Sequence, residues 1–407
     1  MRRTKPPVEY SLLLTATLCL FAFGAVMVYS ASSAESLLEG QGDAAYWLKR
    51  YLLYGAIGLG AMFVLSRHGL RALKVLTPAL LVASFAATLA VLVPGLGVTV
   101  NGATRWLGAG PLQFQPSELL KVALVLWVAQ LLATRGPVLR PALIVVGAAC
   151  MLLMAQPDMG TTMLTCFAIG CLLVAGGVQI RKLALVAGGL ALAALVLALA
   201  EPYRRERLFT FLDPWSDPTD AGFQSVQAMI AMGSGGLFGV GLGESVQKIF
   251  YLPEAHTDMI LAIIGEELGL IGVLGLVGLY GIVAYAGLRA AKLARDRHTK
   301  LVAAGITSLI VCQAVLNFFA VTGLMPLTGV PLPLISYGGS NMIVLLAAMG
   351  LLLNVAATGG RVRLRAVRGG RSAAGSGRGT RAADRDRGRR DGRARRAGAG
   401  GRRRAAG

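Results

Sequence analysis

Apolar runs of about twenty residues recur along most of the chain, separated by short polar connections. A helix rises about 1.5 Å per residue, so a run of about 20 apolar residues crosses the ~30 Å hydrocarbon core of a bilayer. The runs lie at residues 11–31, 47–66, 73–93, 118–133, 141–155, 161–178, 183–200, 259–288, 301–323 and 339–357. They predict an all-α polytopic membrane protein of about ten transmembrane helices, with its membrane domain at residues 11–357.

Positive charges gather in alternate connections between these runs. Arg67, Arg71 and Lys74 follow the second run, and Arg181 and Lys182 follow the sixth. Short loops rich in Lys and Arg stay in the cytoplasm. With an even number of spans, we therefore expect both termini to be cytoplasmic, including an N-terminal segment at residues 1–10, in a cytoplasmic (inner) membrane protein.

One connection, at residues 201–258, is much longer than the others and is expected on the outer side. Phe223, Val226 and Ile230 have helical spacing, which predicts a short amphipathic helix at 220–232, stopped by the glycines that follow. A second irregular stretch, 325–340, contains three prolines and cannot be a continuous helix. We expect it to line a cavity, because non-helical backbone is not tolerated facing lipid.

Composition excludes an ordinary soluble enzyme, since 55% of the residues are hydrophobic and only 15% are charged. The net charge of +20 is unevenly distributed: residues 361–407 hold 17 arginines and three aspartates, or +14, which leaves +6 for the rest. Residues 358–407 show little apolar periodicity, which predicts a disordered cytoplasmic tail. We favour its attraction to anionic lipid and expect no nucleic-acid partner, because the tail has no aromatic residue to stack on a base.

The five cysteines all fall inside apolar runs. Their spacing fits neither a zinc site nor a disulfide framework, and buried cysteine behaves as a small apolar residue. No metal-binding side-chain cluster is predicted.

Asp258 lies where the long outer connection enters the eighth predicted helix. A carboxylate between water and apolar protein can have its pKa tuned toward the range of a general base. The alternative is a helix cap, in which Thr257 or Asp258 accepts the first free amide hydrogens. The polar neighbours Glu254 and His256 give more chemistry than a cap needs.

Other ionisable residues at membrane depth are also candidates, because such residues are costly there. Glu118 and Lys121 share a helix face and either line a polar cavity or neutralise each other. Arg105 either holds an anionic headgroup or forms an interfacial anchor with Trp106. Glu266 lies about two turns after Asp258. The substrate-binding candidates are Arg105, Glu118, Lys121, Asp158, His256, Glu266, Ser336 and Ser340.

Two functional classes follow from these residues: an enzyme acting on a lipid-linked substrate at the outer face, or a transporter that moves an amphiphile across the membrane. An ion-coupled transporter would be expected to carry more charge at mid-membrane and to show internal repeats.

Several motifs identify a family resemblance. They are NGATRWLGAGPLQFQPSELLK at 101–121, QPDMGT at 156–161, the stretch 211–258 ending in YLPEAHTD, GEELG at 265–269 and PLPLISYGGS at 331–340. Together they resemble the SEDS family (shape, elongation, division and sporulation) over roughly residues 10–357. SVQKIFYLPEAHTD is most similar to the cell-division branch, whereas TGVPLP at 328–333 is nearer the elongation branch.

The resemblance implies a peptidoglycan glycosyltransferase that polymerises lipid II during septal cell-wall synthesis. The family's essential aspartate falls on Asp258, as the base for an inverting transfer from an undecaprenyl-pyrophosphate donor. Arg105, Lys121, Arg204, Arg205 and Arg207 are candidates to balance the pyrophosphate charge. A divalent cation, Mg or Mn, would be bound mainly through that pyrophosphate.

The implied partners are a class B penicillin-binding protein and other membrane proteins of the division complex. The alternative activity is a lipid II flippase, which needs cationic groups along a path through the membrane. Few unpaired cations are evident at depth, which favours the polymerase.

Overall fold

The structure is a computed structural model and describes residues 6–38, 42–100, 103–109, 112–200, 210–220, 222–249 and 251–359. One compact unit ends at Thr358. The predicted tail beyond residue 359 and Arg204, Arg205 and Arg207 lie outside the described residues.

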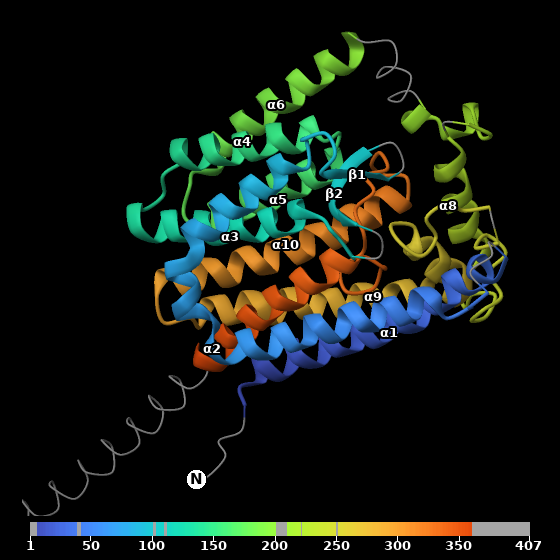
Figure 1. Cartoon of the computed structure of the whole chain (residues 1–407), viewed down its shortest axis with the longest axis horizontal. Coiled ribbons are helices and arrows are strands. Elements are labelled where there is room, and N and C mark those ends of the chain that lie inside the picture. Colours follow the sequence, from blue (N-terminus) through green and yellow to red (C-terminus); the bar gives the residue numbers. More distant parts are fainter. Residues whose placement is uncertain are drawn as a thin grey trace, which may run out of the picture. The chain divides into compact units, whose positions relative to one another are not determined.

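All ten predicted apolar runs are helical (Figure 1). The helices are α1 (Val8–Leu38), α2 (Tyr46–Ala90), α3 (Pro116–Arg135), α4 (Arg140–Ala155), α5 (Met159–Ala175), α6 (Ile180–Ala200), α9 (Ile260–Lys292), α10 (Arg297–Val321) and a last helix, Gly339–Gly359. Within the described residues, seven segments are long and apolar enough to cross a membrane, while α4 and α5 are shorter apolar helices. The polytopic all-α prediction is confirmed.

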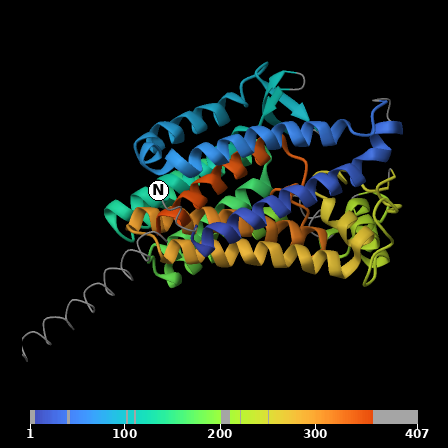
Figure 2. The same ribbon diagram turned by 90° about the horizontal axis from the view of Figure 1, so that it is seen from below.

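Helix α2 supplies two of these spans. Tyr46–His68 and Leu73–Ala90 each meet the length and hydropathy expected of a span. The chain reverses direction between them (Figure 2). The two runs predicted at 47–66 and 73–93 are therefore separate crossings, as expected.

A small antiparallel sheet was not predicted. It consists of β1 (Gly97–Val100), β2 (Ala103–Ala109) and β3 (Leu112–Phe114), in the order β1-β2-β3. Val98 pairs with Trp106, and Leu107 pairs with Phe114. β1 and β3 are only four and three residues long, and the seven residues of β2, ATRWLGA, do not alternate strictly between apolar and polar positions. The sheet lies toward the same end of the bundle as α8 (Phe223–Ser234) (Figures 1 and 2).

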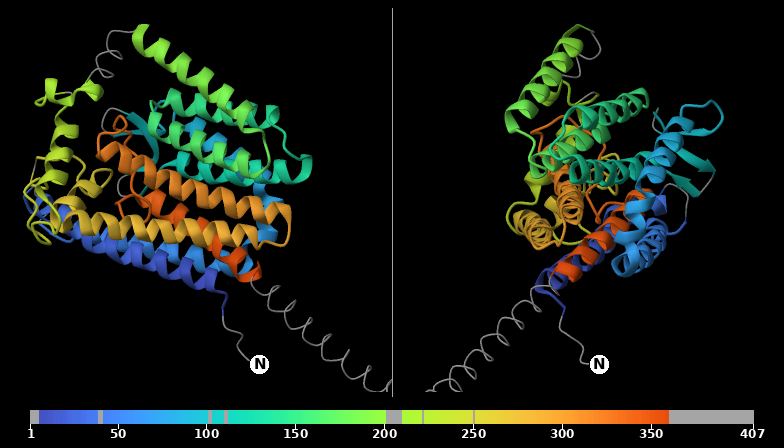
Figure 3. Two further views of the ribbon diagram at one scale, coloured as in Figure 1. Left: turned by 180° about the vertical axis from the view of Figure 1, so that it is seen from behind. Right: turned by 90° about the vertical axis from the view of Figure 1, so that its left-hand side faces the viewer.

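The spans pack around α10 and the last helix, which are the most buried of the seven. α10 contacts α3, α5 and α9, and α9 also packs along α1 (Figure 3). The amphipathic helix predicted at 220–232 is α8, shifted by two or three residues and ended, as predicted, by the following glycines.

Residues 322–338 are irregular, as their prolines predicted, with a 3-residue turn where Leu334 has a φ of +62°. Buried side chains from three helices bond to the carbonyls that a helix would otherwise satisfy. These donors are Asn317 to Val330, Gln313 to Pro331, Tyr280 to Pro333 and Tyr51 to Leu334, at 2.6 to 2.9 Å. Backbone that bonds to protein in this way can lie at membrane depth without being helical.

Candidate functional site

Asp258 lies just before α9, beside the irregular segment. Its backbone carbonyl accepts a hydrogen bond from the Asn317 side-chain amide at 2.7 Å, and the same amide donates to Val330. A Cβ atom built on Gly329 would lie 3.9 Å from the Asp258 carboxylate. The segment around residue 329 is therefore one wall of the space that the carboxylate faces.

The electrostatic surroundings of Asp258 favour its protonated form more than water does. Burial, followed by the neighbouring Glu254 carboxylate, raises the pKa of Asp258 to about 6, partly offset by the Thr257 hydroxyl and by His256. The Thr257 hydroxyl contacts both carboxylates, at 3.2 Å from Asp258 and 2.7 Å from Glu254. Among the described residues, no Lys or Arg forms an ion pair with Asp258. This is the environment of a carboxylate suited to accept a proton near neutral pH.

His256 is fixed by contacts from three directions. Its Nδ1 lies 3.3 Å from the Glu35 carboxylate of α1, and its ring lies 4.6 Å from that of Trp47. The Tyr337 backbone N–H donates to the His256 carbonyl at 3.0 Å. These contacts hold the chain two residues before Asp258 against α1, α2 and the irregular segment.

Asp158 is buried immediately before the start of α5. It caps α5 by accepting from the Thr161 N–H at 3.1 Å, and its second carboxylate oxygen is buried without a partner. Gly160 packs directly on the Thr328 carbonyl, where a Cβ would be only 2.0 Å away. The start of α5 at Gly160 and the Asp258 carboxylate thus both lie next to the backbone at 328–330.

Arg105 joins the small sheet to the turn between α4 and α5. Its guanidinium donates to the carbonyls of Gln156, at 3.2 Å, and Pro157, and it lies 4.0 Å from the Asp158 carboxylate. A cavity of about 430 Å³ adjoins these carbonyls and the β1–β2 hairpin. Two of the three guanidinium nitrogens thus donate to backbone carbonyls. The Arg105–Trp106 anchor and the headgroup contact both stay predictions.

Glu118 and Lys121 form a buried ion pair at 2.9 Å at the start of α3. Asn341 donates to the second Glu118 oxygen at 2.7 Å, and the Ser340 hydroxyl accepts from the Gln115 N–H at 2.9 Å. The start of the last helix is therefore joined to the start of α3 by polar contacts. The ion pair agrees with the interpretation in which the two residues neutralise each other, and a role in lining a polar cavity stays a prediction.

Two other candidates have local partners. The Ser336 hydroxyl accepts from the Leu332 N–H at 2.8 Å and stabilises the turn of the irregular segment. The Glu266 carboxylate accepts from the Ser245 hydroxyl and from the Val246 N–H. The sequence reading also missed Lys248, a buried cation that pairs with Glu267 at 2.9 Å.

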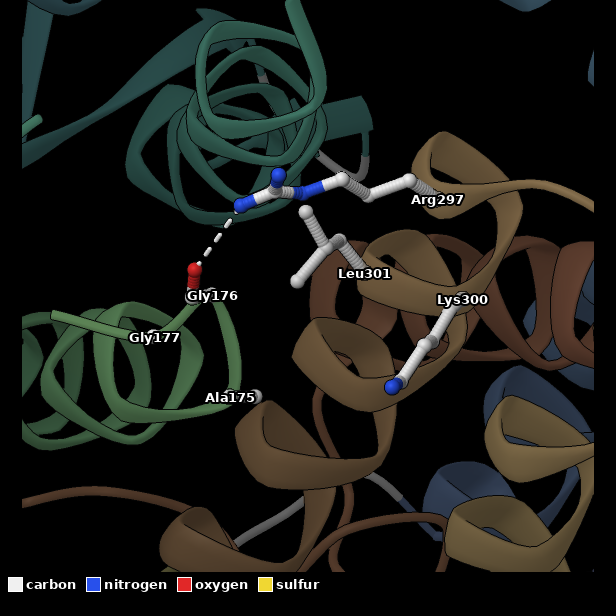
Figure 4. A pocket seen from close by; sticks show the side chains of 6 residues that line it. All are labelled: Ala175, Gly176, Gly177, Arg297, Lys300 and Leu301. Carbon is white, nitrogen blue, oxygen red and sulfur yellow. Dashed lines mark hydrogen bonds between the residues drawn. The ribbon is translucent and has the colours of Figure 1, made fainter. Parts of the chain in front are cut away.

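A second cavity, of about 340 Å³, lies where α5 ends and α10 begins (Figure 4). Arg297 donates to the Gly176 carbonyl at 3.1 Å, and the Lys300 side chain takes no part in that bond. Because α10 begins just after α9 ends, this cavity is at the opposite end of α9 from Asp258. It is not part of the candidate site.

The residues present could contribute only a few ligands to a metal ion. In the part of the chain that the structure describes, no three His, Cys, Asp or Glu side chains gather as a metal site. A divalent ion beside Asp258 would take most of its oxygen ligands from a bound substrate, as hard cations do with phosphates.

The fold and the site define a polytopic membrane protein with a carboxylate of raised pKa just before the start of a span, beside a segment of irregular backbone. The family described as "Cell cycle protein", that of FtsW, RodA and SpoVE, matches residues 10–359. The chain belongs to this family, which confirms the SEDS resemblance.

Relatives of known name match over nearly their whole length. A "Probable peptidoglycan glycosyltransferase FtsW" from a Geobacter species is 41% identical over 356 residues, covering 84% of this chain and 95% of that protein. Stage V sporulation protein E of Bacillus subtilis is 40% identical over 365 residues, covering 87% and 98%.

Solved structures agree with the fold. A chain from a study titled "Structural coordination of polymerization and crosslinking by a peptidoglycan synthase complex" has a TM-score of 0.70 at 32% identity, covering 84% of this chain and 96% of that chain. The rod shape determining protein RodA of Thermus thermophilus has a TM-score of 0.62 at 30% identity, covering 84% and 95%.

Proposed function

We propose that this protein is a glycosyltransferase that polymerises lipid II into peptidoglycan strands at the outer face of the cytoplasmic membrane during septal wall synthesis. One observation carries the proposal: Asp258 is a partly buried carboxylate with a pKa of about 6, beside irregular backbone, and among the described residues no Lys or Arg forms an ion pair with it. Relatives named as peptidoglycan glycosyltransferases support the same class of activity.

In the proposed reaction, the Asp258 carboxylate takes the proton from the 4-hydroxyl of the acceptor's N-acetylglucosamine. That oxygen attacks C1 of the donor's N-acetylmuramic acid, and the bond from C1 to undecaprenyl pyrophosphate breaks on the opposite face. The anomeric centre is therefore inverted. A base with a pKa of about 6 is mostly ionised at neutral pH and still accepts a proton in the transition state.

The leaving pyrophosphate carries negative charge, which a cation should balance. Arg105 is the better-placed candidate, because its 4.0 Å separation from Asp158 leaves it less neutralised than Lys121, which pairs with Glu118 at 2.9 Å. A divalent cation, Mg or Mn, held mainly by the pyrophosphate, would supply further charge compensation.

The two buried lysines, Lys121 and Lys248, argue against the alternative flippase activity. A flippase needs positive groups along the path of the pyrophosphate, yet Lys121 and Lys248 are each paired with a glutamate at 2.9 Å. Neither lysine offers a free positive charge inside the bundle. The pairing favours polymerisation at the Asp258 end over translocation.

Partners and orientation follow from the same proposal. A class B penicillin-binding protein would crosslink the strands, in line with the similar chain from a peptidoglycan synthase complex. The end that carries α8 and Asp258 would face outward, with both termini in the cytoplasm. The arginine-rich tail, outside the described residues, would contact anionic lipid.

The test uses the full chain purified with its transpeptidase partner, supplied with lipid II and Mg²⁺ or Mn²⁺. We expect wild type to form glycan polymer on a gel and both Asp258→Ala and Asp258→Asn to form none. Asp296→Asn is the control, because Asp296 caps α10 at the far end of α9. Equal polymer from wild type and Asp258→Ala would refute the base. Lipid II translocation in proteoliposomes without polymer, unchanged in the Asp258 variants, would favour the flippase.

A further inference from the structure

Helix α9 is broken shortly after its start. Gly269 has a φ of +64° and a ψ of −164°, outside the helical region. In a continuous helix, the N–H groups of Leu270 and Ile271 would bond to the carbonyls of Glu266 and Glu267. The break removes these two bonds inside a segment long and apolar enough to cross a membrane, where unpaired backbone groups are costly.

The loop that follows α8 replaces both bonds with four. The Val240 and Gly241 N–H groups donate to the carbonyls of Glu266 and Glu267 at 2.9 and 3.0 Å. The freed N–H groups of α9 donate in turn to loop carbonyls; these bonds join Leu270 to Gly236 at 3.0 Å and Ile271 to Leu237 at 3.2 Å. The loop is therefore inserted into the hydrogen-bond ladder of α9 and ends beside α1 (Figures 1 and 3).

Side chains fasten the same loop a second time. Glu266 accepts from the Ser245 hydroxyl, and Glu267 accepts from the Lys248 ammonium at 2.9 Å. Ser30 of α1 also donates to Glu267 at 2.7 Å. Ser245, Lys248, Glu266 and Glu267 are all at least nine-tenths buried. Two adjacent glutamates of α9 thus hold the chain at 245–248.

These contacts close the stretch 245–267 into a ring, and Asp258 lies in its middle. Joining the ends of a segment removes conformations that its central residues could otherwise adopt. Within the ring, the Leu252 N–H donates to the Gln247 carbonyl at 2.9 Å, and the Met259 N–H donates to the Glu254 carbonyl at 3.3 Å. The backbone on both sides of Asp258 is therefore fixed by bonds inside the ring.

We propose that Lys248 and Glu267 are positioning residues for Asp258: their buried ion pair keeps the 245–267 ring closed and so holds the carboxylate in its reactive place. The proposal rests on the proposed function, because it treats Asp258 as the base. On this proposal, the GEELG motif at 265–269 and the loop that follows α8 act together to close the ring.

Three variants test the Lys248–Glu267 ion pair. Lys248→Met removes it, and Lys248→Arg keeps it. The double variant Lys248→Met/Glu267→Gln removes it without leaving an unpaired buried charge. The control is Arg289→Gln. Arg289 pairs with Glu9 at 3.1 Å across the same two helices, α9 and α1, at the end away from Asp258.

The first measurement is hydrogen exchange of the amides at 251–259 in the purified, folded complex. We expect at least tenfold faster exchange there in Lys248→Met and in the double variant, and wild-type exchange in Lys248→Arg and Arg289→Gln. Wild-type exchange in a folded double variant would overturn the proposal. This readout does not depend on activity, so it stays informative even if Asp258→Ala polymerises lipid II and the proposed function fails.

The second measurement is lipid II polymerisation per folded molecule. We expect kcat to fall at least tenfold in the double variant, with KM within twofold, and recovery in Lys248→Arg. The acid limb of the pH profile should also move below pH 6, because an opened ring admits water to Asp258 and so weakens the burial that is the main cause of its raised pKa. An unchanged kcat and acid limb in the folded double variant would show that the ion pair serves stability alone.

Discussion

The side-chain amide of Asn317 donates to the backbone carbonyl of Asp258 at 2.7 Å and to that of Val330 at 2.9 Å. One residue of α10 therefore joins the candidate base to the irregular segment in front of it. The distance between Asp258 and that wall is set by α10, a span that packs against α3, α5 and α9. The backbone of Asp258 and that of Val330 are thus both held by a helix in the interior of the bundle.

We predict that Asn317→Leu lowers the rate of polymerisation per folded molecule, beyond the loss of stability that a comparable substitution elsewhere would cause. The substitution leaves two carbonyls without a donor, and each buried unsatisfied group costs about 1–3 kcal/mol. Asn354→Leu is the matched control. Asn354 lies near the end of the last helix, away from Asp258, and also donates to two carbonyls, those of Leu65 and Ser66 in α2. Thermal unfolding should show similar losses for both variants, whereas glycan synthesis per folded molecule should fall only in Asn317→Leu. Equal activities would contradict the role assigned to Asn317.

The pH dependence of polymerisation should report on Asp258. Burial and Glu254 raise its pKa to about 6, so the base form is lost as the pH falls through 6, and kcat/KM should drop about tenfold per pH unit below that value. Stability should respond in the opposite sense. The folded state takes up a proton more readily than the unfolded chain, so this group favours folding at low pH, and that contribution is lost as the pH rises from about 4 to 6.

Rates and thermal midpoints measured from about pH 3 to 8 would check both statements, and Asp258→Asn is the variant that should lack the pH dependence of stability. An acid limb near pH 4 would mean that the carboxylate is solvated during turnover.

Local patterns predicted much of the architecture. Apolar runs located ten helical segments, seven of them long and apolar enough to cross a membrane among the described residues. Three prolines located the irregular segment, and helical spacing with a glycine stop located α8. Asp258 was identifiable because a carboxylate at a loop-to-helix junction is unusual in a chain with so few charges. All of these signals are contained within about twenty neighbouring residues.

The contacts that build the site could not be read in this way. Glu267 meets Ser30 across 237 positions of sequence, and Asn341 meets Glu118 across 223. The sequence around Lys248 gives no sign that this residue is buried. Its partner is Glu267 of α9, and the loop reaches α9 where that helix is broken at Gly269. The strands β1 and β3 are very short, and β2 lacks the alternation of apolar and polar residues that would mark a strand. Pairing partners far apart in sequence require the fold itself.

The Glu118–Lys121 pair should be needed as a pair. Lys121→Met leaves Glu118 buried with only Asn341 as a partner, and removing one member of a buried ion pair costs about 3–5 kcal/mol. The double variant Lys121→Met/Glu118→Gln should recover most of that stability, because it buries no unpaired charge. Folded yield in membranes and thermal midpoint in detergent would measure the effect. A double variant less stable than Lys121→Met would show that the pair contributes a net attraction larger than its desolvation cost.

The last prediction concerns the contact between α5 and the irregular segment, and the same helix supplies its control. A Cβ at Gly160 would lie 2.0 Å from the Thr328 carbonyl, whereas one at Gly170 would meet nothing within 4 Å. Gly160→Ala should therefore force α5 away from 328–330, at about 1–3 kcal/mol of stability, and disturb the wall that faces Asp258. Gly170→Ala should be neutral or stabilise the protein by up to about 1 kcal/mol, since alanine favours helix. Thermal unfolding together with glycan synthesis would separate the two. If Gly160→Ala kept wild-type stability and activity, residues 328–330 would be free to yield, and the carboxylate would not depend on them for its place.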